Sequence, residues 1–335
     1  MKRRLFLLSG SASATALALS ACGGGGGGAD GIDTTPTGSI VSDTRPPGSV
    51  LSETPTQPAN QSDSALASKL LGCYYTAWDG SHAITSVPTD FNVIYLFNAQ
   101  NGGTNTGDGS WHWPFASTVS AAQVQQVRKR GQKVVLTVGG AGLGYSYTNR
   151  TQSTRCVDSI RSIIDSLGGV DGVDFNNYEA GIGTSLGEMV WIAQQLVATY
   201  GPGFMITSPP APTSTGGGPV NGIAMGAPAD LNVMGALADA GVLTYAAPQF
   251  YDWSFYNGPG VISSIAEQWI ARLGADKVVL GLSANYPNGP SLADCIREYE
   301  AVRTKHPNIR GAYCWSAQNN MAAGNVWGST MRSLL

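Results

Sequence analysis

The stretch Val170-Asp171-Gly172-Val173-Asp174-Phe175-Asn176-Asn177-Tyr178-Glu179 has two β-branched valines and a phenylalanine in its first six residues, with aspartates at positions 171 and 174, and ends in two amides, a phenol and a carboxyl. Strands of parallel sheets are covered on both faces and therefore form nearly continuous apolar runs. Polar groups that follow such a strand lie at its carboxyl end, where α/β barrels carry their chemistry. The stretch therefore predicts a parallel strand with a candidate functional site at its end.

Seven other apolar runs resemble this one, and segments with helical spacing lie between them. The predicted strands are 71–77, 92–97, 133–138, 170–175, 204–208, 244–251, 277–282 and 311–316. The predicted helices are 121–130, 154–166, 186–200, 230–240, 261–273 and 292–306. Eight strands, nearly all followed by a helix or a long loop, predict an α/β fold, a (β/α)8 TIM barrel that forms a single domain.

A doubly wound sheet is the main alternative, and it would require a glycine-rich phosphate turn after the first strand. The only glycine-rich turn that ends a predicted strand is Val138–Gly144, after the third. A dinucleotide fingerprint needs glycines at spacings of two and then three. From Gly140 the last of these falls on Tyr145, and from Gly139 the middle one falls on Ala141. We therefore expect no dinucleotide cofactor.

The composition excludes several other classes of partner. Charged residues are 12% of the 335, and the net charge is −3 with no basic stripe, which argues against nucleic acid. Three histidines and scattered cysteines offer little material for a zinc site, so we expect no metal. No internal run approaches the length of a transmembrane helix. We expect the body to be a monomer.

Residues 1–22 have the features of an export signal, with a positive start at Met1–Arg4 and a short apolar segment behind it. Leu19-Ser20-Ala21-Cys22 resembles the lipobox of bacterial lipoproteins, in which the cysteine is acylated. Arg3-Arg4 resembles a twin-arginine signal. The leader therefore predicts an exported lipoprotein, periplasmic or at the cell surface, held to the membrane only through lipid on Cys22.

Residues 23–64 are dominated by Gly, Thr, Pro and Ser and lack the period of a helix or strand. Such a segment buries too little apolar surface to offset its ordering entropy, so we expect a flexible linker. The barrel is expected to occupy residues 65–335.

Polar and aromatic residues gather at the ends of five predicted strands. These ends are Thr137–Gly140, Asp171–Glu179, Thr207–Pro212, Gln249–Trp253 and Tyr313–Ser316. Aromatic rings stack on sugar faces, and amides and carboxylates bond hydroxyl and acetamido groups. Aromatic residues in the loops could extend such a site, namely Trp78, Trp111, Trp113, Trp253 and Tyr256. Together these residues favour a groove that binds polysaccharide.

In this order, the motifs resemble those of family 18 glycoside hydrolases, the chitinases and endo-β-N-acetylglucosaminidases, over about residues 70–335. The stretch from Asp171 is similar to the family motif Asp-Gly-x-Asp-x-Asp-x-Glu, and Thr137–Gly140, with Gly139 and Gly140, to its Ser-x-Gly-Gly strand. The segment Gln249–Asp252, with Gln249, Tyr251 and Asp252, looks like the strand whose tyrosine contacts the substrate acetamido group. Trp315 matches the aromatic floor of the subsite where cleavage occurs.

The resemblance implies cleavage of β-1,4 links beside N-acetylglucosamine, with retention and without cofactor or metal. In that mechanism a glutamic acid protonates the glycosidic oxygen, and the substrate's own acetamido oxygen attacks the anomeric carbon. The aspartate two residues earlier orients the acetamido group and helps to keep the glutamic acid protonated, because two close carboxylates resist joint ionisation. Binding residues implied in this way are Trp315, Asn176, Tyr178, Gln249, Asp252, Gly139, Gly140 and Trp78.

The chain departs from the family motif at its last two acidic positions. Alternation along a strand keeps Asp174 and Asn176 inward, but the next inward residue is Tyr178, and Glu179 comes one residue late. A bulge near Asn177 would turn Glu179 inward as the acid and leave Asn177 to hold the acetamido group. A regular strand would instead put Tyr178 in the acid's place, and the barrel would bind glycans without cleaving them.

Four cysteines follow the linker: Cys73, Cys156, Cys295 and Cys314. We expect buried free thiols. The alternative is a disulfide between Cys73 and Cys314, because the first and last strands become neighbours when a barrel closes.

Overall fold

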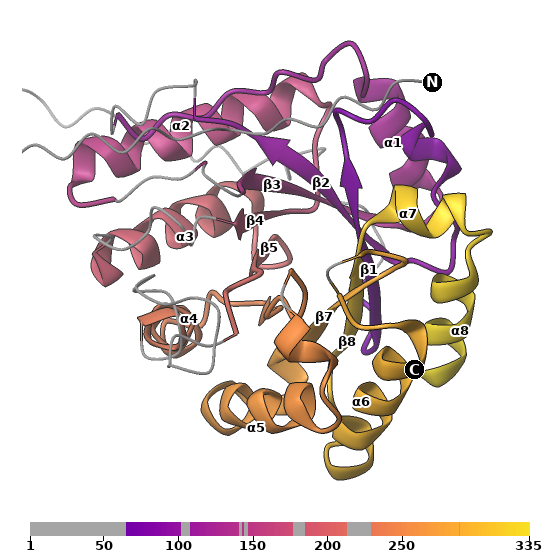
Figure 1. The fold of residues 1–335 in the computed structure, drawn as a ribbon. Coiled ribbons are helices and arrows are strands. Elements are labelled where there is room, and N and C mark those ends of the chain that lie inside the picture. Colours follow the sequence, from indigo (N-terminus) through magenta and orange to yellow (C-terminus); the bar gives the residue numbers. More distant parts are fainter. Residues whose placement is uncertain are drawn as a thin grey trace, which may run out of the picture. The chain divides into compact units, whose positions relative to one another are not determined.

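A computed structural model describes residues 65–101, 108–140, 143, 147–176, 185–212, 229–252, 254–287 and 289–335. These residues form an eight-stranded parallel sheet with the order β6-β5-β4-β3-β2-β1-β8-β7, surrounded by helices (Figure 1). Two isolated parallel bridges, Ala246 with Val278 and Gln249 with Gly281, join the outermost strands of this order. The predicted (β/α)8 barrel is therefore confirmed, and the doubly wound sheet is excluded.

The strands agree with the predicted runs to within a few residues, except for the sixth. They are β1 Leu70–Thr76, β2 Val93–Ala99, β3 Lys133–Gly139, β4 Gly172–Asn176, β5 Met205–Ser208, β6 Tyr245–Ala246, β7 Val279–Ser283 and β8 Gly311–Trp315. The α-helices are α1 Ala121–Lys129, α2 Arg150–Ser166, α3 Leu186–Tyr200, α4 Ala229–Asp239, α5 Val261–Leu273, α6 Leu292–Lys305, α7 Ala317–Ala322 and α8 Val326–Leu334. Three 3-10 turns are η1 Ile84–Ser86, η3 Ser254–Asn257 and η4 Ala275–Lys277.

Strand β6 is much shorter than the predicted 244–251. Proline has no N–H for a ladder and is found at strand edges and irregularities, and Pro248 lies inside the predicted run. Single hydrogen bonds continue the pairing beyond it, since Gly281 N donates to Pro248 O and Phe250 N donates to Gly281 O. The prediction was thus right about the path of the chain and wrong about the length of the strand.

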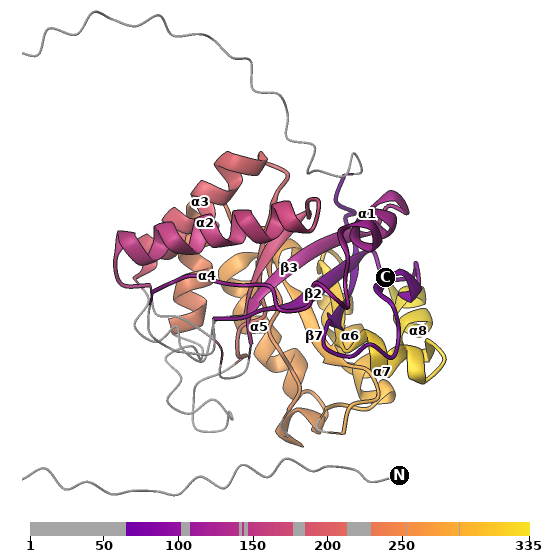
Figure 2. The ribbon, with the colours of Figure 1, turned by 90° about the horizontal axis from the view of Figure 1, so that it is seen from above.

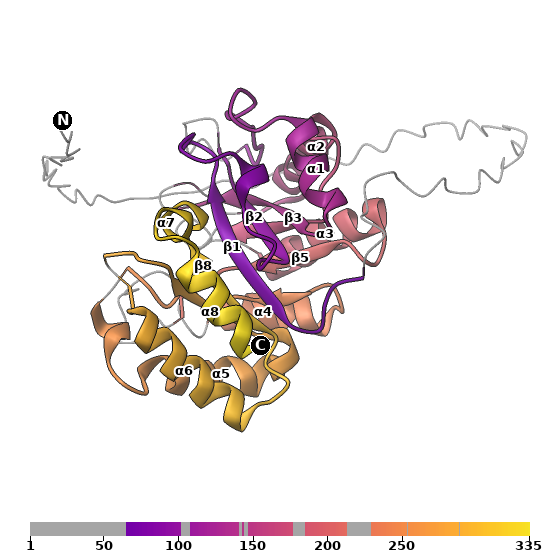
Figure 3. The ribbon, with the colours of Figure 1, turned by 90° about the vertical axis from the view of Figure 1, so that its right-hand side faces the viewer.

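Two further helices, α7 and α8, follow the last strand and were not predicted. They lie on the opposite side of the barrel from α2 and α3 (Figure 2). Helix α8 contacts both α6 and α7 (Figure 3). Helix α7 spans only six residues, so its period covers too few turns to be recognised, and α8 contains Gly328, a poor helix former.

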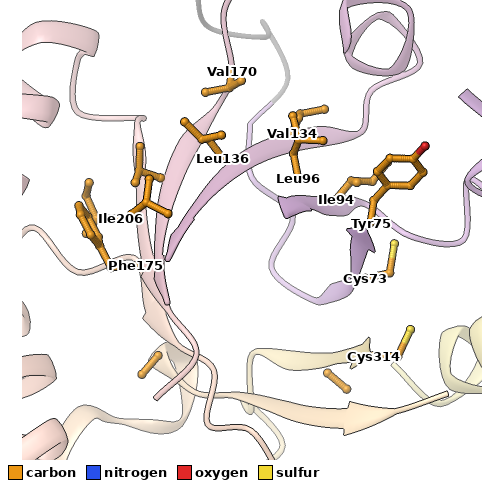
Figure 4. Close-up of a cluster of buried hydrophobic side chains, with 14 of the residues drawn as sticks. Cys73, Tyr75, Ile94, Leu96, Val134, Leu136, Val170, Phe175, Ile206 and Cys314 are labelled. Carbon is orange, nitrogen blue, oxygen red and sulfur yellow. The ribbon is translucent and has the colours of Figure 1, made fainter. Parts of the chain in front are cut away.

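Side chains that point away from the barrel axis form the larger of two cores, between the strands and the helices. Figure 4 shows part of this layer, in which Leu136, Phe175 and Ile206 lie on one side and Cys73 and Cys314 on the other. Cys73 and Cys314 are paired in register on β1 and β8. All four described cysteines are buried free thiols, as expected.

The second core fills the barrel and is rich in tyrosine. Its buried members include Tyr74, Tyr95, Tyr245 and Tyr313. Two rings need a glycine on a neighbouring strand, because a Cβ at Gly72 would lie 2.8 Å from the Tyr95 ring and a Cβ at Gly281 would overlap the Tyr313 ring. The barrel interior is therefore packed and closed below its carboxyl-terminal mouth.

Asp171, the first acid of the motif, lies outside this interior and joins β3, β4 and α1. Its carboxylate accepts hydrogen bonds from the Arg128 guanidinium at 3.1 Å and from the backbone N–H of Val134 at 2.9 Å. Lys133 Nζ is 3.7 Å away. Both side chains of the Arg128–Asp171 pair are only 4% exposed, so neither charge has water as an alternative partner. Asp171 is therefore a structural residue.

We predict that Asp171→Asn destabilises the fold by about 3–5 kcal/mol, because it leaves the buried Arg128 charge without its anion. Urea unfolding of the variant and the wild type measures the difference. Asp158→Asn is the control, since that side chain is 66% exposed and its pair with Arg161 is worth little. Equal stabilities of Asp171→Asn and the wild type would contradict the structural role of Asp171.

Candidate functional site

Asp174 lies at the centre of the barrel and is completely buried. Its carboxyl group accepts three hydroxyl hydrogen bonds, from Tyr74 on β1 at 2.7 Å, from Thr137 on β3 at 3.1 Å and from Thr207 on β5 at 2.7 Å. The alternation of strand residues places all four side chains on the inner face at one level. Asp174 therefore connects four strands as well as lying beneath the mouth.

Burial raises the pKa of Asp174 from 3.8 to about 6, although the three hydroxyl donors lower it. The desolvation of a carboxylate outweighs hydrogen bonding here because no cation lies among the groups that bond it. Burial also raises the pKa values of Tyr74, Tyr95 and Tyr313 well above 10. The interior thus holds neutral phenols around a carboxyl group that titrates near neutrality.

Asn176 ends β4 on the inward side, where the family motif has its third aspartate. It is paired in register with Gly139 and is 5% exposed. Within the described part of the chain, its buried Oδ1 has no hydrogen-bond partner. An amide oxygen without a partner in a buried position leaves an acceptor available to a ligand.

Gly139 and Gly140 bring β3 close to this residue. Gly140 N donates to the Asn176 carbonyl at 2.7 Å, and a Cβ on Gly139 would overlap the same carbonyl. Their φ values of +90° and +133° also favour glycine. Their visible role is to allow this close approach of two backbones.

Aromatic rings form one wall of the mouth. Trp315, half-buried at the end of β8, stacks with Tyr251 at a centroid distance of 6.4 Å and an angle of 23°. Trp78 follows β1, is 51% exposed, and lies 6.4 Å from the Trp315 ring. This aromatic wall therefore consists of Trp315, Tyr251 and Trp78, which come from the ends of three different strands.

Polar partners fix the residues that follow β6. The Tyr251 hydroxyl donates to Gln249 Oε1 at 2.7 Å, and Gln249 Nε2 donates to the Pro209 carbonyl. Asp252, at φ +72°, accepts a hydrogen bond from the Tyr286 hydroxyl at 2.6 Å, and partial burial raises its pKa. Gln249 thus holds the Tyr251 hydroxyl in place, and the Asp252 carboxylate is hydrogen-bonded to Tyr286.

Some sequence-predicted residues are not part of this arrangement. Trp111 and Tyr256 are buried in the outer core at 4% and 0% exposure, so their prediction as cleft residues was wrong. Trp111 instead donates to the Tyr147 hydroxyl. Asn177, Tyr178, Glu179 and Trp253 lie outside the described residues, as do Cys22 and the predicted linker.

The sequence analysis did not single out Tyr74, Tyr286 or Asn98, and it named Thr207 only as the start of a polar strand end. Tyr74 and Thr207 could have been assigned as partners of Asp174 from the inward phase of their strands. The amide of Asn98, within β2, donates to the Gly139 carbonyl, while its buried Oδ1 has no partner among the described residues. Tyr286 belongs to the loop after β7, which carries no strand or helix period.

No group of three His, Cys, Asp or Glu side chains in the described ranges is placed to hold a metal. No described helix is long and apolar enough to cross a bilayer.

The fold and site define a (β/α)8 barrel with carboxyl, amide and aromatic groups at its mouth. No family model and no curated protein matches the sequence. The fold resembles that of a family GH18 chitinase from Chromobacterium violaceum, at 20% identity over 80% of this chain and 83% of the other, with a TM-score of 0.66. It also resembles a fungal family 18 endo-β-N-acetylglucosaminidase, at 15% identity over 79% and 99%, with a TM-score of 0.62. The xylanase-α-amylase inhibitor protein XAIP-I, solved with trehalose, matches at 15% identity over 80% and 99%, with a TM-score of 0.60. The chain therefore has a family 18 glycoside hydrolase-like fold.

We predict that Asp174 makes stability depend on pH in a window set by its shifted pKa. The folded pKa of about 6 lies above the ordinary value of 3.8 for an aspartate, so the favourable contribution of Asp174 is complete below pH 3.8 and is lost as pH rises through 6. Two pH units correspond to about 3 kcal/mol. Between pH 4 and pH 7 the wild type should therefore lose about this much stability relative to Asp174→Asn, as measured by urea unfolding. Parallel stability curves for the two proteins would refute this assignment.

Proposed function

We propose that this protein is a glycoside hydrolase that cleaves β-1,4 links adjacent to N-acetylglucosamine in chitin or in a related glycan. The observation that carries the proposal is the buried Oδ1 of Asn176, which has no hydrogen-bond partner among the described residues and lies at the end of the strand that holds Asp174. Trp315 at the end of β8 and Tyr251 after β6 supply an aromatic wall at the same mouth. An acetamido sugar offers what this site lacks, an N–H donor for the amide oxygen and an apolar ring face for the indole.

In the proposed reaction Glu179 gives its proton to the glycosidic oxygen, and the bond from that oxygen to the anomeric carbon breaks. The acetamido oxygen of the same sugar forms the new bond to that carbon, which gives an oxazolinium ion. Water then adds with Glu179 as base, so the configuration is retained and the proton is returned. Asn177 or Asn176 orients the acetamido group, with Tyr251 on its other side.

The site has two charge states, because Asp174 can be protonated or ionised. Near its pKa of about 6, the buried group can hold a proton while its hydroxyl neighbours remain neutral. An amide at position 176 cannot share a proton as the family's aspartate does. We therefore expect slower cleavage than in enzymes with the full acidic motif.

A second candidate function is glycan binding without cleavage. Strand β4 is regular through Asn176, whose partner Gly139 continues the unbroken register. If this alternation continued, Tyr178 would take the acid's position, and a phenol with a pKa of about 10 is a poor acid for this step. That XAIP-I, named as an inhibitor, shares the fold is consistent with a barrel of this kind serving for binding.

We predict that Glu179→Gln abolishes the cleavage of chitin oligosaccharides and of a high-mannose N-glycan, read by mass spectrometry, and leaves binding intact. Glutamine keeps the shape of the side chain but has no proton of suitable acidity to give. Glu300→Gln, the same change at an exposed position of α6, is the matched control and should retain activity. Undiminished cleavage by Glu179→Gln would overturn the assignment of the acid.

Binding by the wild type with both substrates intact at every pH tested would establish the non-catalytic alternative. In that case Trp315→Ala should still remove binding at the barrel mouth, since both functions use the aromatic floor.

We further propose that the protein is exported and anchored through an acyl group on Cys22, as the lipobox-like Leu19–Cys22 suggests. Cys22→Ser should move the protein from the membrane fraction to the soluble fraction and remove label from incorporated palmitate. A charge-neutral control, Ser20→Ala, should leave both readouts unchanged. Membrane association of Cys22→Ser equal to that of the wild type would exclude this anchor.

A further inference from the structure

A cavity of about 470 Å³ lies between the loop after β7 and the helices after β8. One wall comes from residues 284–287 and 289–292, and Asn257 at the end of η3 adds to it. The opposite wall comes from Asn320 and Ala323 on the α7 side and from Val326 and Trp327 of α8. Its volume is in the range typical of small-molecule sites.

The wall from α7 and α8 is fixed by buried hydrogen bonds. Asn320 is fully buried, donates to Asn325 Oδ1 at 2.7 Å and accepts from Gly328 N at 3.0 Å. Asn325 in turn donates to Asp90 at 2.6 Å. On the other side, Ser291 and Asp294 form a capping box at the start of α6. The cavity is therefore preformed, which lowers the entropic cost of binding.

The groups free to bind a ligand are amides and apolar surfaces. The exposed side chains of Asn257 and Asn285 line the cavity and make no hydrogen bond within the described residues. Pro287 and Val326, the latter 51% exposed, add apolar surface. Each amide offers a donor and an acceptor side by side, which suits adjacent hydroxyl groups of a sugar ring.

The charged residues around the cavity favour a neutral ligand over an anionic one. No Lys or Arg is among the described residues that line it. Its single carboxylate, Asp294, has a pKa lowered by hydrogen bonds from Ser291 and by Arg297, so it is ionised at neutral pH. Arg297 already pairs with Asp294 at 2.6 Å, so an anionic ligand would find no further cation among the described lining residues, whereas a neutral polyol needs none.

We propose that this cavity is a second carbohydrate site, which binds a neutral sugar unit independently of the barrel mouth. A thin wall separates the two sites. Gly289 lines the cavity, and a Cβ at that position would lie 3.2 Å from the Cβ of Tyr251. Tyr286 also lines the cavity, and its ring meets the Tyr251 ring edge-on at 6.3 Å. A polysaccharide could thus be held at two places on one molecule, which raises its overall affinity.

The test is isothermal titration of triacetylchitotriose into the full chain carrying Glu179→Gln, so that the ligand stays intact. The cavity variant is Asn257→Ala with Asn285→Gly, because Asn285 has a φ of +53° that glycine accepts without strain. Asn308→Ala is the matched control, an exposed amide just before β8, at the other end of that strand from the mouth. Trigalacturonate is the charged counterpart of the ligand.

We expect Trp315→Ala to lose binding at the mouth and to retain one binding event, at the cavity. Adding the two cavity substitutions to Trp315→Ala should weaken this remaining event about tenfold or more, because two amides are lost. Asn308→Ala should leave it unchanged, and trigalacturonate should not occupy it. The inference is overturned if Trp315→Ala removes all binding. It is also overturned if the two cavity substitutions leave the affinity of the remaining binding event unchanged. If the wild type cleaves nothing and Trp315→Ala has no effect, while the cavity variant loses binding, the proposed function fails and this inference stands.

Discussion

The buried carboxyl group of Asp174 is the interaction on which the centre of the barrel depends. A carboxyl group removed from water needs partners, and β1, β3 and β5 each supply one hydroxyl to it. These bonds fix the relative heights of four strands, and therefore the level at which Asn176, Tyr251 and Trp315 meet the mouth. The same burial raises its pKa to about 6, so this core residue titrates near neutrality.

The tyrosines around Asp174 have to fill the barrel interior and also find hydrogen-bond partners for their hydroxyls. Tyrosines fill the interior where many barrels have branched aliphatic side chains, and their hydroxyls then need partners at the same level. The pairs Tyr95–Tyr245 and Tyr251–Tyr313 provide them. Glycines at positions 72 and 281 leave room for the rings. A substitution that improves packing in this layer would therefore also disturb the hydrogen bonds that position the mouth.

The barrel could be predicted from sequence because its strands are continuous apolar runs separated by helical periods of ordinary length. The predicted length of the sixth strand was wrong because Pro248 interrupts the ladder while the chain keeps its direction. Helix α7 is too short to show a period, and Gly328 weakens the helical signal of α8. At the site, strand phase correctly placed Asp174 and Asn176. Trp111 and Tyr256 were assigned to the cleft because aromatic residues in loops look alike whether they pack inward or bind sugar. The phase of Glu179 cannot be derived from alternation, since a single extra residue reverses it.

The pairing of β1 with β8 has a consequence for how the chain is made. One edge of Leu70–Thr76 stays open until Gly311–Trp315 has left the ribosome, some 240 residues later at about 5–20 residues per second. Cys73 and Cys314 meet only at that moment. For most of synthesis, a hydrophobic strand edge is therefore exposed to other nascent chains. A cell that exports this protein before folding would need to keep that edge covered, and one that exports it afterwards would need to wait for the final strand.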